Sequence, residues 1–130
     1  MSRIASLFLL LFVIGCASTK PAGPSPSLAW DFQVKRLGEF PKGKVYLKVN
    51  GQNHLVVSDA TTNYQQLKPA EYADYHIPAD ALLASYSWHA GFGDIMYVLR
   101  KGNTLQVYRQ EMDEAEDSEY PLKRVAVIPF

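Results

Sequence analysis

The sequence predicts an all-β fold, a mainly antiparallel meander that forms a small barrel or a curled sheet. The first observation is the recurrence of apolar residues at every second position from Leu28 onward, which is typical of strands. The second is a set of turns containing Gly and Asn between these runs, as expected where hairpins join strands. Residues 65–85 depart from this pattern, and we expect one or two short helical turns there.

The first β region centres on the segment KVYLKVNGQNHLVVS. Val45, Leu47 and Val49 are expected to share one side of a strand, and a second apolar run follows the turn. Asn50-Gly51 between the runs is the strongest short hairpin signal, because a type I′ turn requires positive φ at both central residues. The preceding segment DFQVKRL also alternates and predicts a further strand.

The C-terminal half contains four further β-rich runs, SYSWHA, DIMYVLR, TLQVYRQE and LKRVAVI. Short turns and one acidic connection separate them, which predicts an antiparallel meander. We expect Leu105 and Val107 to face the core with Tyr108 outward. In the last strand, Val125 and Val127 are expected to face the core. The segment IMYVL does not alternate and predicts a central strand that is covered on both faces.

The irregular middle of the chain contains Pro69 and Pro78 and few β-forming residues. Proline is favoured at the first position of a helix. We therefore expect short helical turns around Pro69–Asp74 and Ala79–Ala84.

The first residues of the chain have the composition of a targeting segment. Arg3 precedes an apolar run from Ile4 to Ile14, which has the charge and length of a secretory signal. A membrane-spanning helix needs roughly 20 apolar residues, so this run is too short to be one. One interpretation is an ordinary cleaved secretory signal that is followed by a cysteine only by chance.

The segment VIGC, which ends at Cys16, resembles the lipobox of bacterial lipoproteins. The resemblance is confined to the part of the chain up to this cysteine. It implies cleavage before Cys16, diacylglycerol on the Cys16 thiol, and acylation of the new amino terminus by a fatty acid such as palmitate. Several acyl chains together hold a protein on a membrane far better than one.

The predicted organisation has three parts. Residues 1–15 are a signal peptide, residues 16–27 are the lipidated cysteine and a flexible tether rich in Pro and Ser, and residues 28–130 are a single β-rich domain. In lipoproteins of enteric bacteria, Asp after the cysteine favours the inner membrane, whereas Ala17 follows it here. The resemblance therefore implies an outer-membrane anchor that faces the periplasm, with the inner membrane and the cell surface as alternatives.

Composition limits the partners that we expect. The charges balance, with 13 Lys and Arg against 13 Asp and Glu, so nothing favours nucleic acid. Cys16 is the only cysteine, and its lipidation would leave no thiol for a disulfide, a metal or a nucleophile. His54, His76 and His89 are far apart and belong to no metal-binding motif, so we expect neither a metal nor a cofactor.

Catalytic motifs are not indicated. The chain has no GxSxG motif. Four residues lie close in sequence, but proximity does not by itself make a triad; they are Ser85, Ser87, His89 and Asp94. The segment GFGD predicts a tight turn rather than a phosphate-binding loop, because no helix follows it. The acidic run at 111–119 lacks the spacing of an EF-hand and predicts a solvated connection, and cation binding by it remains an open alternative.

Aromatic residues are the features that we weigh most for binding. They gather in the irregular middle and around the SYSWHAGFG turn, and such loops often carry function. Ordinary packing is the alternative, because the side that carries Trp88 could be the core face. The candidate binding residues are Tyr72, Tyr75, His76, Trp88, His89 and Phe92.

The sequence favours a non-catalytic, lipid-anchored envelope protein that binds an envelope protein or a cell-wall glycan. In outline the layout resembles the periplasmic lysozyme inhibitors, which are small lipid-anchored or secreted β-barrel proteins. The SGxxY-type inhibitory loop and the disulfide of that family have no counterpart here, so no residue is carried over. A small envelope hydrolase is the third alternative.

Overall fold

The computed structural model describes residues 24–37, 40–60, 63–114 and 120–130, with only the backbone at 34–37 and 40–42. Most of these residues lie in antiparallel strands, which confirms the all-β prediction. The predicted signal peptide and Cys16 lie outside the described residues. Within the described part of the chain, no helix has the length and apolar character needed to cross a membrane.

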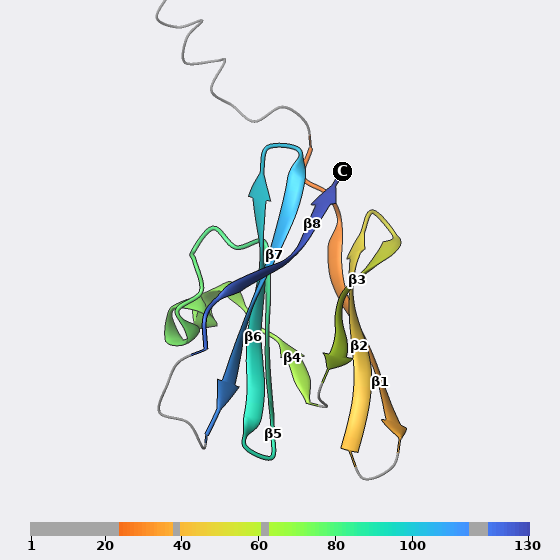
Figure 1. Cartoon of the computed structure of the whole chain (residues 1–130). Coiled ribbons are helices and arrows are strands. Elements are labelled where there is room, and N and C mark those ends of the chain that lie inside the picture. The colour runs from red at the N-terminus through yellow and green to blue at the C-terminus, as the bar shows by residue number, and fades with distance from the viewer. Residues whose placement is uncertain (1–23, 38–39, 61–62, 115–119) are drawn as a thin grey trace, which may run out of the picture.

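The strands form two open sheets, and consecutive strands pair antiparallel within each sheet (Figure 1). Neither sheet closes into a barrel among the described residues, so the barrel alternative is wrong. The first sheet contains β1 (Leu28–Leu37), β2 (Phe40–Val49) and β3 (Gln52–Ala60). The second contains β4 (Tyr64–Gln66), β5 (Leu83–His89), β6 (Phe92–Lys101), β7 (Thr104–Asp113) and β8 (Lys123–Pro129), and the 3₁₀-helix η1 (Pro69–Tyr75) lies between β4 and β5 in the chain.

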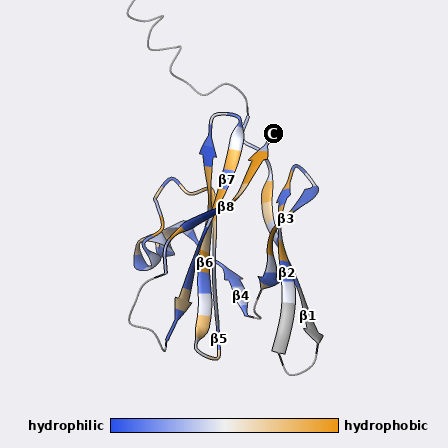
Figure 2. Ribbon diagram, in the orientation of Figure 1, coloured by the Kyte–Doolittle hydropathy of each residue, from blue (hydrophilic) through white to orange (hydrophobic). Residues whose placement is uncertain are grey.

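The two sheets lie face to face and share one apolar core (Figures 1 and 2). Alternation places Val45 and Leu47 of β2 on the inner face, as predicted, and both side chains are fully buried. Leu105 and Val107 of β7 are also fully buried, which confirms their predicted orientation. Burying one such side chain contributes about 1.5–3 kcal/mol relative to leaving it exposed.

The outer face of the five-stranded sheet is partly covered by η1 and its flanking residues. Leu67, Tyr72 and Ile77 pack there against Tyr97 of β6. Residues 94–98 of β6 are therefore buried on both faces, which confirms the prediction from IMYVL. Tyr108, predicted to face outward, joins this second cluster and stacks on Tyr97 with ring centroids 5.4 Å apart.

The helix η1 confirms the first of the two expected helical turns. Pro69 begins it, and Glu71 Oε1 accepts a hydrogen bond from the backbone N–H of Lys68 at 3.0 Å. The second turn, expected at Ala79–Ala84, is only a single hydrogen-bonded turn, in which the backbone N–H of Ala81 donates to the carbonyl oxygen of Pro78 at 3.1 Å, and it does not continue as a helix. The backbone N–H of Leu82 donates to the carbonyl oxygen of Val98 at 2.9 Å, and β5 begins at the next residue, because pairing with β6 prevails over the local helical preference.

Two hairpin turns follow their sequence signals. Asn50 and Gly51 have φ values of 49° and 86°, which confirms the predicted type I′ turn. A tight turn of the same kind is present beside GFGD, where Ala90 and Gly91 have φ values of 52° and 87°. Only the first residue of GFGD belongs to this turn, because β6 already begins at Phe92. Both turns place a glycine where a left-handed backbone is required.

One core prediction in β8 is wrong because of a β-bulge. Val107 pairs with Ala126, whereas the next residue, Tyr108, pairs with Arg124, so Val125 is an extra residue in β8. The bulge breaks the strict alternation of the strand. Val125 packs partly against the core as predicted, but Val127 is 47% exposed.

Candidate functional site

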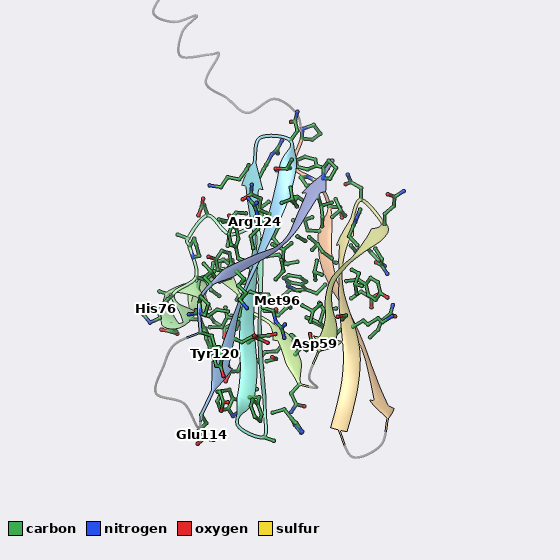
Figure 3. All side chains as sticks on the ribbon, in the orientation of Figure 1. Asp59, His76, Met96, Glu114, Tyr120 and Arg124 are labelled. Carbon is green, nitrogen blue, oxygen red and sulfur yellow. The ribbon has the colours of Figure 1, made fainter. Side chains whose placement is uncertain are left out.

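The inner face of the five-stranded sheet changes from apolar to polar along its strands. β6 and β7 run antiparallel, and toward the same end of the sheet their inner faces carry polar side chains. On β6 the position next to Met96 on this face is Asp94, and on β7 the positions next to Val107 are Arg109 and then Glu111. The apolar part forms the shared core. The polar part lies toward the end of the domain that carries the β5–β6 turn (Figures 1 and 3).

A hydrogen-bond network centred on the Asp94 carboxylate occupies this polar part. Asp94 is only 1% exposed. Its Oδ2 accepts hydrogen bonds from the Tyr64 hydroxyl at 2.9 Å and from Arg109 Nε at 2.6 Å. Its Oδ1 accepts one from Ser87 Oγ at 2.9 Å, and the Asp94 backbone N–H donates to Ser87 Oγ at 3.1 Å. A buried carboxylate is tolerated because it is paired and hydrogen-bonded in this way.

Strand register brings these residues together. Tyr64 of β4 pairs with Ser87 of β5, which pairs with Asp94 of β6, which in turn pairs with Glu111 of β7. The four side chains therefore form one row across the sheet, because directly paired residues share a face. Arg109 lies one step along β7 on the same face and reaches back to Asp94.

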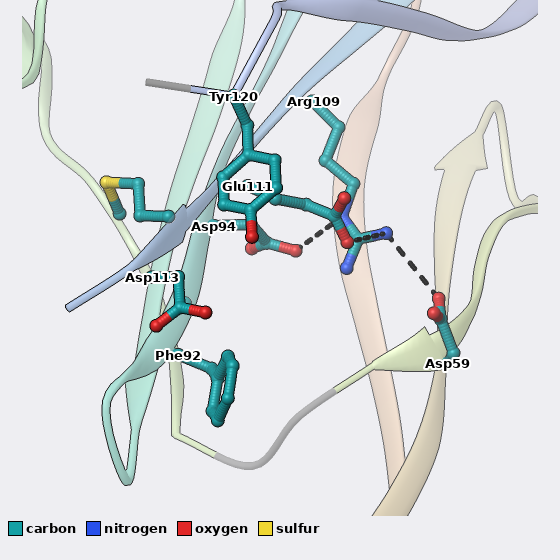
Figure 4. A pocket seen from close by; sticks show the side chains of 9 residues that line it. Asp59, Phe92, Asp94, Arg109, Glu111, Asp113 and Tyr120 are labelled. Atoms are coloured by element: carbon teal, nitrogen blue, oxygen red, sulfur yellow. Dashed lines mark hydrogen bonds and ion pairs between the residues drawn. The ribbon is translucent and has the colours of Figure 1, made fainter. Parts of the chain in front are cut away.

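Arg109 also connects the two sheets. Its guanidinium NH1 lies 3.5 Å from Asp59 Oδ1 on β3 of the opposite sheet and 3.5 Å from Glu111 Oε1 (Figure 4). Burial is the largest single effect and opposes the charge of Arg109, but the charge and hydrogen bond of Asp94, together with Tyr64 and Glu111, outweigh it, so the pKa of Arg109 is raised. Burial and the charge of Asp94 both raise the pKa of Tyr64. Arg109 is therefore the cation of the network, and Tyr64 acts as a neutral donor.

The network borders a pocket of about 330 Å³ (Figure 4). Phe92 and Tyr120 supply aromatic rings to its lining, and four carboxylates face a single guanidinium. A pocket in which several polar groups converge is the default candidate for a binding site. The lining residues are Asp59, Phe92, Gly93, Asp94, Arg109, Glu111, Met112, Asp113 and Tyr120, and we refer to this site as the Asp94 pocket.

The chain enters the domain at the opposite end. The backbone N–H of Ser27 donates to Asn50 Oδ1 at 3.0 Å, and the backbone N–H of Asn50 donates to the carbonyl oxygen of Ser27 at 2.9 Å. The β6–β7 turn is at this end too, and Arg100 lies over the ring of Phe130 at 4.8 Å. A second pocket of about 320 Å³ is found here, lined by Pro24, Ser25, Pro26, Asn50, Arg100, Asn103 and Phe130.

Three of the six predicted binding residues lie in or directly after η1. Tyr72 is buried in the outer-face cluster, and the ring of Tyr75 packs against Tyr86 with centroids 5.0 Å apart. His76 is exposed just after the helix, with a left-handed φ of 57°. Packing accounts for the two tyrosines, which was the alternative interpretation of these residues.

The other three gather around the β5–β6 turn. Asn63 Nδ2 lies 3.3 Å from His89 Nδ1 and donates to the carbonyl oxygen of Trp88 at 3.3 Å. Phe92 is 55% exposed, and of the six predicted residues it is the one that lines the Asp94 pocket. The structure therefore brings Trp88, His89 and Phe92 together at the turn, but it places the η1 residues elsewhere.

Tyr64 and Arg109 were not among the candidate residues predicted from the sequence. Ser87 was considered only as a nucleophile beside His89, whereas in the structure His89 contacts Asn63 and Ser87 donates directly to Asp94. Among the described residues, these side chains do not form a serine–histidine–aspartate relay. Ser87 and Asp94 lie at alternating strand positions whose side chains face the buried interior. This pattern could have indicated the network, but the aromatic residues on the other face of β5 suggested that their side was the core face.

Metal binding has no support in the described part of the chain, where no three His, Cys, Asp or Glu side chains are grouped so as to hold an ion. Residues 115–119 of the acidic run lie outside the described residues.

Comparisons with protein-family models, with curated proteins and with solved structures found no match.

Proposed function

We propose that the protein is a lipid-anchored lipoprotein of the bacterial cell envelope whose β domain is a non-catalytic binding module facing the periplasm. The observation that supports this proposal best is the placement of the Asp94 pocket. Its lining residues Phe92 and Gly93 lie beside the β5–β6 turn, at the end of the domain opposite to Ser27, where the proposed tether would join (Figure 1). An anchored domain would thus hold this pocket away from the membrane.

The anchor itself rests on the sequence. The positive residue, the short apolar run and the lipobox-like segment ending at Cys16 occur in the order that lipoprotein signals require. The segment from Ala17 to Ser27 contains three prolines and would extend about 30 Å, at about 3 Å per residue. That reach would let the domain meet partners in the periplasm while remaining attached, with the outer membrane favoured by Ala17.

The hydrogen bonds and the ion pair around Asp94 favour binding over catalysis. Ser87 Oγ both donates to the Asp94 carboxylate and accepts from the Asp94 backbone, so its hydrogen bonds fix the carboxylate in place. Arg109 neutralises that carboxylate at 2.6 Å. Groups satisfied in this way form a rigid wall, and rigid walls suit recognition.

Substitution of the lipobox cysteine tests the anchor. Cys16→Ser should abolish metabolic labelling with a radioactive fatty acid and release the protein from the membrane fraction, because the acyl chains hold it there. Ser18→Ala, a change in the adjacent tether, should leave both unchanged. A Cys16→Ser protein that still carries label and sediments with membranes would contradict the anchor.

Chemical cross-linking in intact envelopes tests the binding role. The wild-type chain and a Phe92→Ala variant are recovered under denaturing conditions, and the bound species are compared. A protein or a cell-wall glycan captured by the wild type and lost with Phe92→Ala supports a binding module that uses the Asp94 pocket. Asp74→Asn, at an exposed position on η1, is the control and should capture as the wild type does. Identical capture by all three variants would remove the pocket from the proposal.

A further inference from the structure

The Asp94 pocket carries more negative than positive charge. Asp59, Asp94, Glu111 and Asp113 line it together with one cation, Arg109. The shortest ion pair, at 2.6 Å, joins Arg109 to Asp94, so the carboxylate at the back of the pocket is already matched. Asp59 and Glu111 share the same guanidinium at the longer distance of 3.5 Å, so these three carboxylates together carry more charge than Arg109 balances.

Two of the mouth carboxylates keep capacity for another donor. Asp59 Oδ1 and Glu111 Oε1 each lie 3.5 Å from the same NH1 atom, far looser than the contact with Asp94. Each ionised carboxylate has two oxygens and about four acceptor sites. The side chain of Asp59 is 76% exposed and that of Glu111 is 46% exposed, so both can be reached from solvent.

Phe92 adds an apolar surface beside these carboxylates. It continues the inner-face row of β6 beyond Asp94, yet its ring is 55% exposed and lines the pocket (Figure 4). An exposed ring beside carboxylates suits a cation attached to an apolar stem, because the ring contacts the stem or the cation while the oxygens accept hydrogen bonds.

An inorganic cation fits these observations poorly. Calcium takes 6–8 oxygen ligands, whereas the described residues contain no group of three acidic or histidine side chains that could hold an ion. The pocket already places one guanidinium among its carboxylates, which shows the kind of cation that this geometry accepts. Its volume of about 330 Å³ is at the lower end for small-molecule sites.

We infer that the Asp94 pocket binds an organic cation, a guanidinium or ammonium group on an apolar stem, with Glu111 and Asp59 accepting its hydrogen bonds and Phe92 covering the stem. This inference rests on the proposed function and names the ligand chemistry of that same site. The cation comes either from an arginine or lysine side chain of a partner protein or from a free polyamine, and the chemistry recognised is the same.

Nuclear magnetic resonance of the isotope-labelled full chain in detergent micelles tests the inference. The first probe is N-acetyl-arginine amide, and its neutral isostere N-acetyl-citrulline amide is the matched control. We expect saturable shifts of the backbone amides of Gly93 and Met112 with the arginine probe, weakened by salt, and none with the citrulline probe. Spermidine is the third probe, and tighter binding of spermidine would identify a free polyamine as the source.

Charge variants complete the test. Glu111→Gln should weaken binding of the arginine probe roughly fivefold, as expected for the loss of one partly exposed charge pair. Asp74→Asn removes the same charge from a site on η1 and should leave binding unchanged. Equal binding of the citrulline probe, binding unaffected by Glu111→Gln, or no saturable shift with any probe would overturn the inference. If envelope capture remained dependent on Phe92 in that case, the binding module would stand and the cation would be wrong.

Discussion

The interior between the two sheets has an apolar half and a polar half, built on the same strands with the same alternation. In the apolar half, Met96 and Leu105 are fully buried among other aliphatic side chains. In the polar half, equivalent inward positions hold Ser87, Asp94 and Arg109. Apolar burial stabilises a fold directly, whereas a buried ion pair roughly offsets its own desolvation. The comparison predicts that the apolar half supplies most of the stability of the fold, whereas the intact ion pair of the polar half adds little to it.

The largest expected effect follows from breaking the ion pair. Arg109→Met should lower the free energy of unfolding by about 3–5 kcal/mol, because Asp94 would be left buried without its counter-charge. Urea denaturation of the full chain in detergent measures this change. The double variant Asp94→Leu/Arg109→Met should recover most of the loss or exceed the wild type. A double variant as unstable as the single one would show that the polar half does stabilise the fold.

The next effect belongs to the apolar half. Leu105→Ala should lower the free energy of unfolding by about 2–5 kcal/mol, since it removes buried methyl groups and leaves a cavity. Binding at the Asp94 pocket should be retained below the unfolding transition, because Leu105 does not line the pocket. Urea denaturation and the arginine-probe titration together check this separation. Lost binding in a folded Leu105→Ala protein would mean that the two halves are coupled.

A smaller effect, with a defined pH dependence, is expected at Tyr64. Below about pH 10 the Tyr64 hydroxyl is neutral in both the folded and the unfolded state, so its full contribution to the free energy of unfolding is present there. Above that pH the unfolded state ionises first, because burial and Asp94 raise the pKa of the folded state, and stability falls as the pH rises. Tyr64→Phe should lower stability by about 1 kcal/mol at neutral pH and reduce this alkaline slope.

Part of the slope should survive in Tyr64→Phe, because burial also raises the pKa values of Tyr72, Tyr86 and Tyr97. Urea denaturation at a series of alkaline pH values measures the difference between the two proteins. An identical slope in both would show that Tyr64 titrates alike in the folded and unfolded chains.

The last expected effects, no larger than that at Tyr64, compare the turns at the two ends of the domain. Gly51→Ala and Gly91→Ala each place a side chain at a positive φ, of 86° and 87°, and each should lower stability by about 1 kcal/mol. Space does not distinguish the two sites, because a Cβ at Gly91 would meet Glu114 Oε2 at an ordinary 3.5 Å. Thermal unfolding of both variants checks the expectation. A much larger loss at one turn would show that this end supports the fold beyond its local backbone.

Alternation and turn chemistry were sufficient to predict most of the fold. The Asn50-Gly51 hairpin and the C-terminal meander follow from local signals, which the structure confirms. The errors arise where tertiary contacts override such signals. The bulge at Val125 exposes Val127, and pairing with β6 extends β5 into the second expected helical turn. Neither the bulge nor this strand pairing can be predicted from a short segment of sequence, because both depend on a partner strand.

The candidate site was much harder to predict than the fold. Asp94 contacts Tyr64 and Arg109, which lie 30 and 15 residues away, and only the register of three strand pairs places them together. Phe92 was predicted as a binding residue because it is an aromatic residue in the SYSWHAGFG turn, and the structure places it at the pocket. Tyr72 and Tyr75 were chosen for the same aromatic character, but both pack in the apolar cluster on the outer face of the five-stranded sheet. Residue type alone therefore did not separate recognition from packing.

The edge position of β1 has a mechanical consequence for a tethered domain. The chain enters at Ser27 and continues directly into β1, which pairs with β2 through ten consecutive residue pairs. If a partner held the opposite end, tension on the tether would run along the strand axis, and the hydrogen bonds, which are perpendicular to the strands, would share the load in shear. In shear all the hydrogen bonds between β1 and β2 carry the force at once, whereas a hairpin pulled open from one end loses them one after another. The domain would therefore stay folded under a force that opens a hairpin from its end.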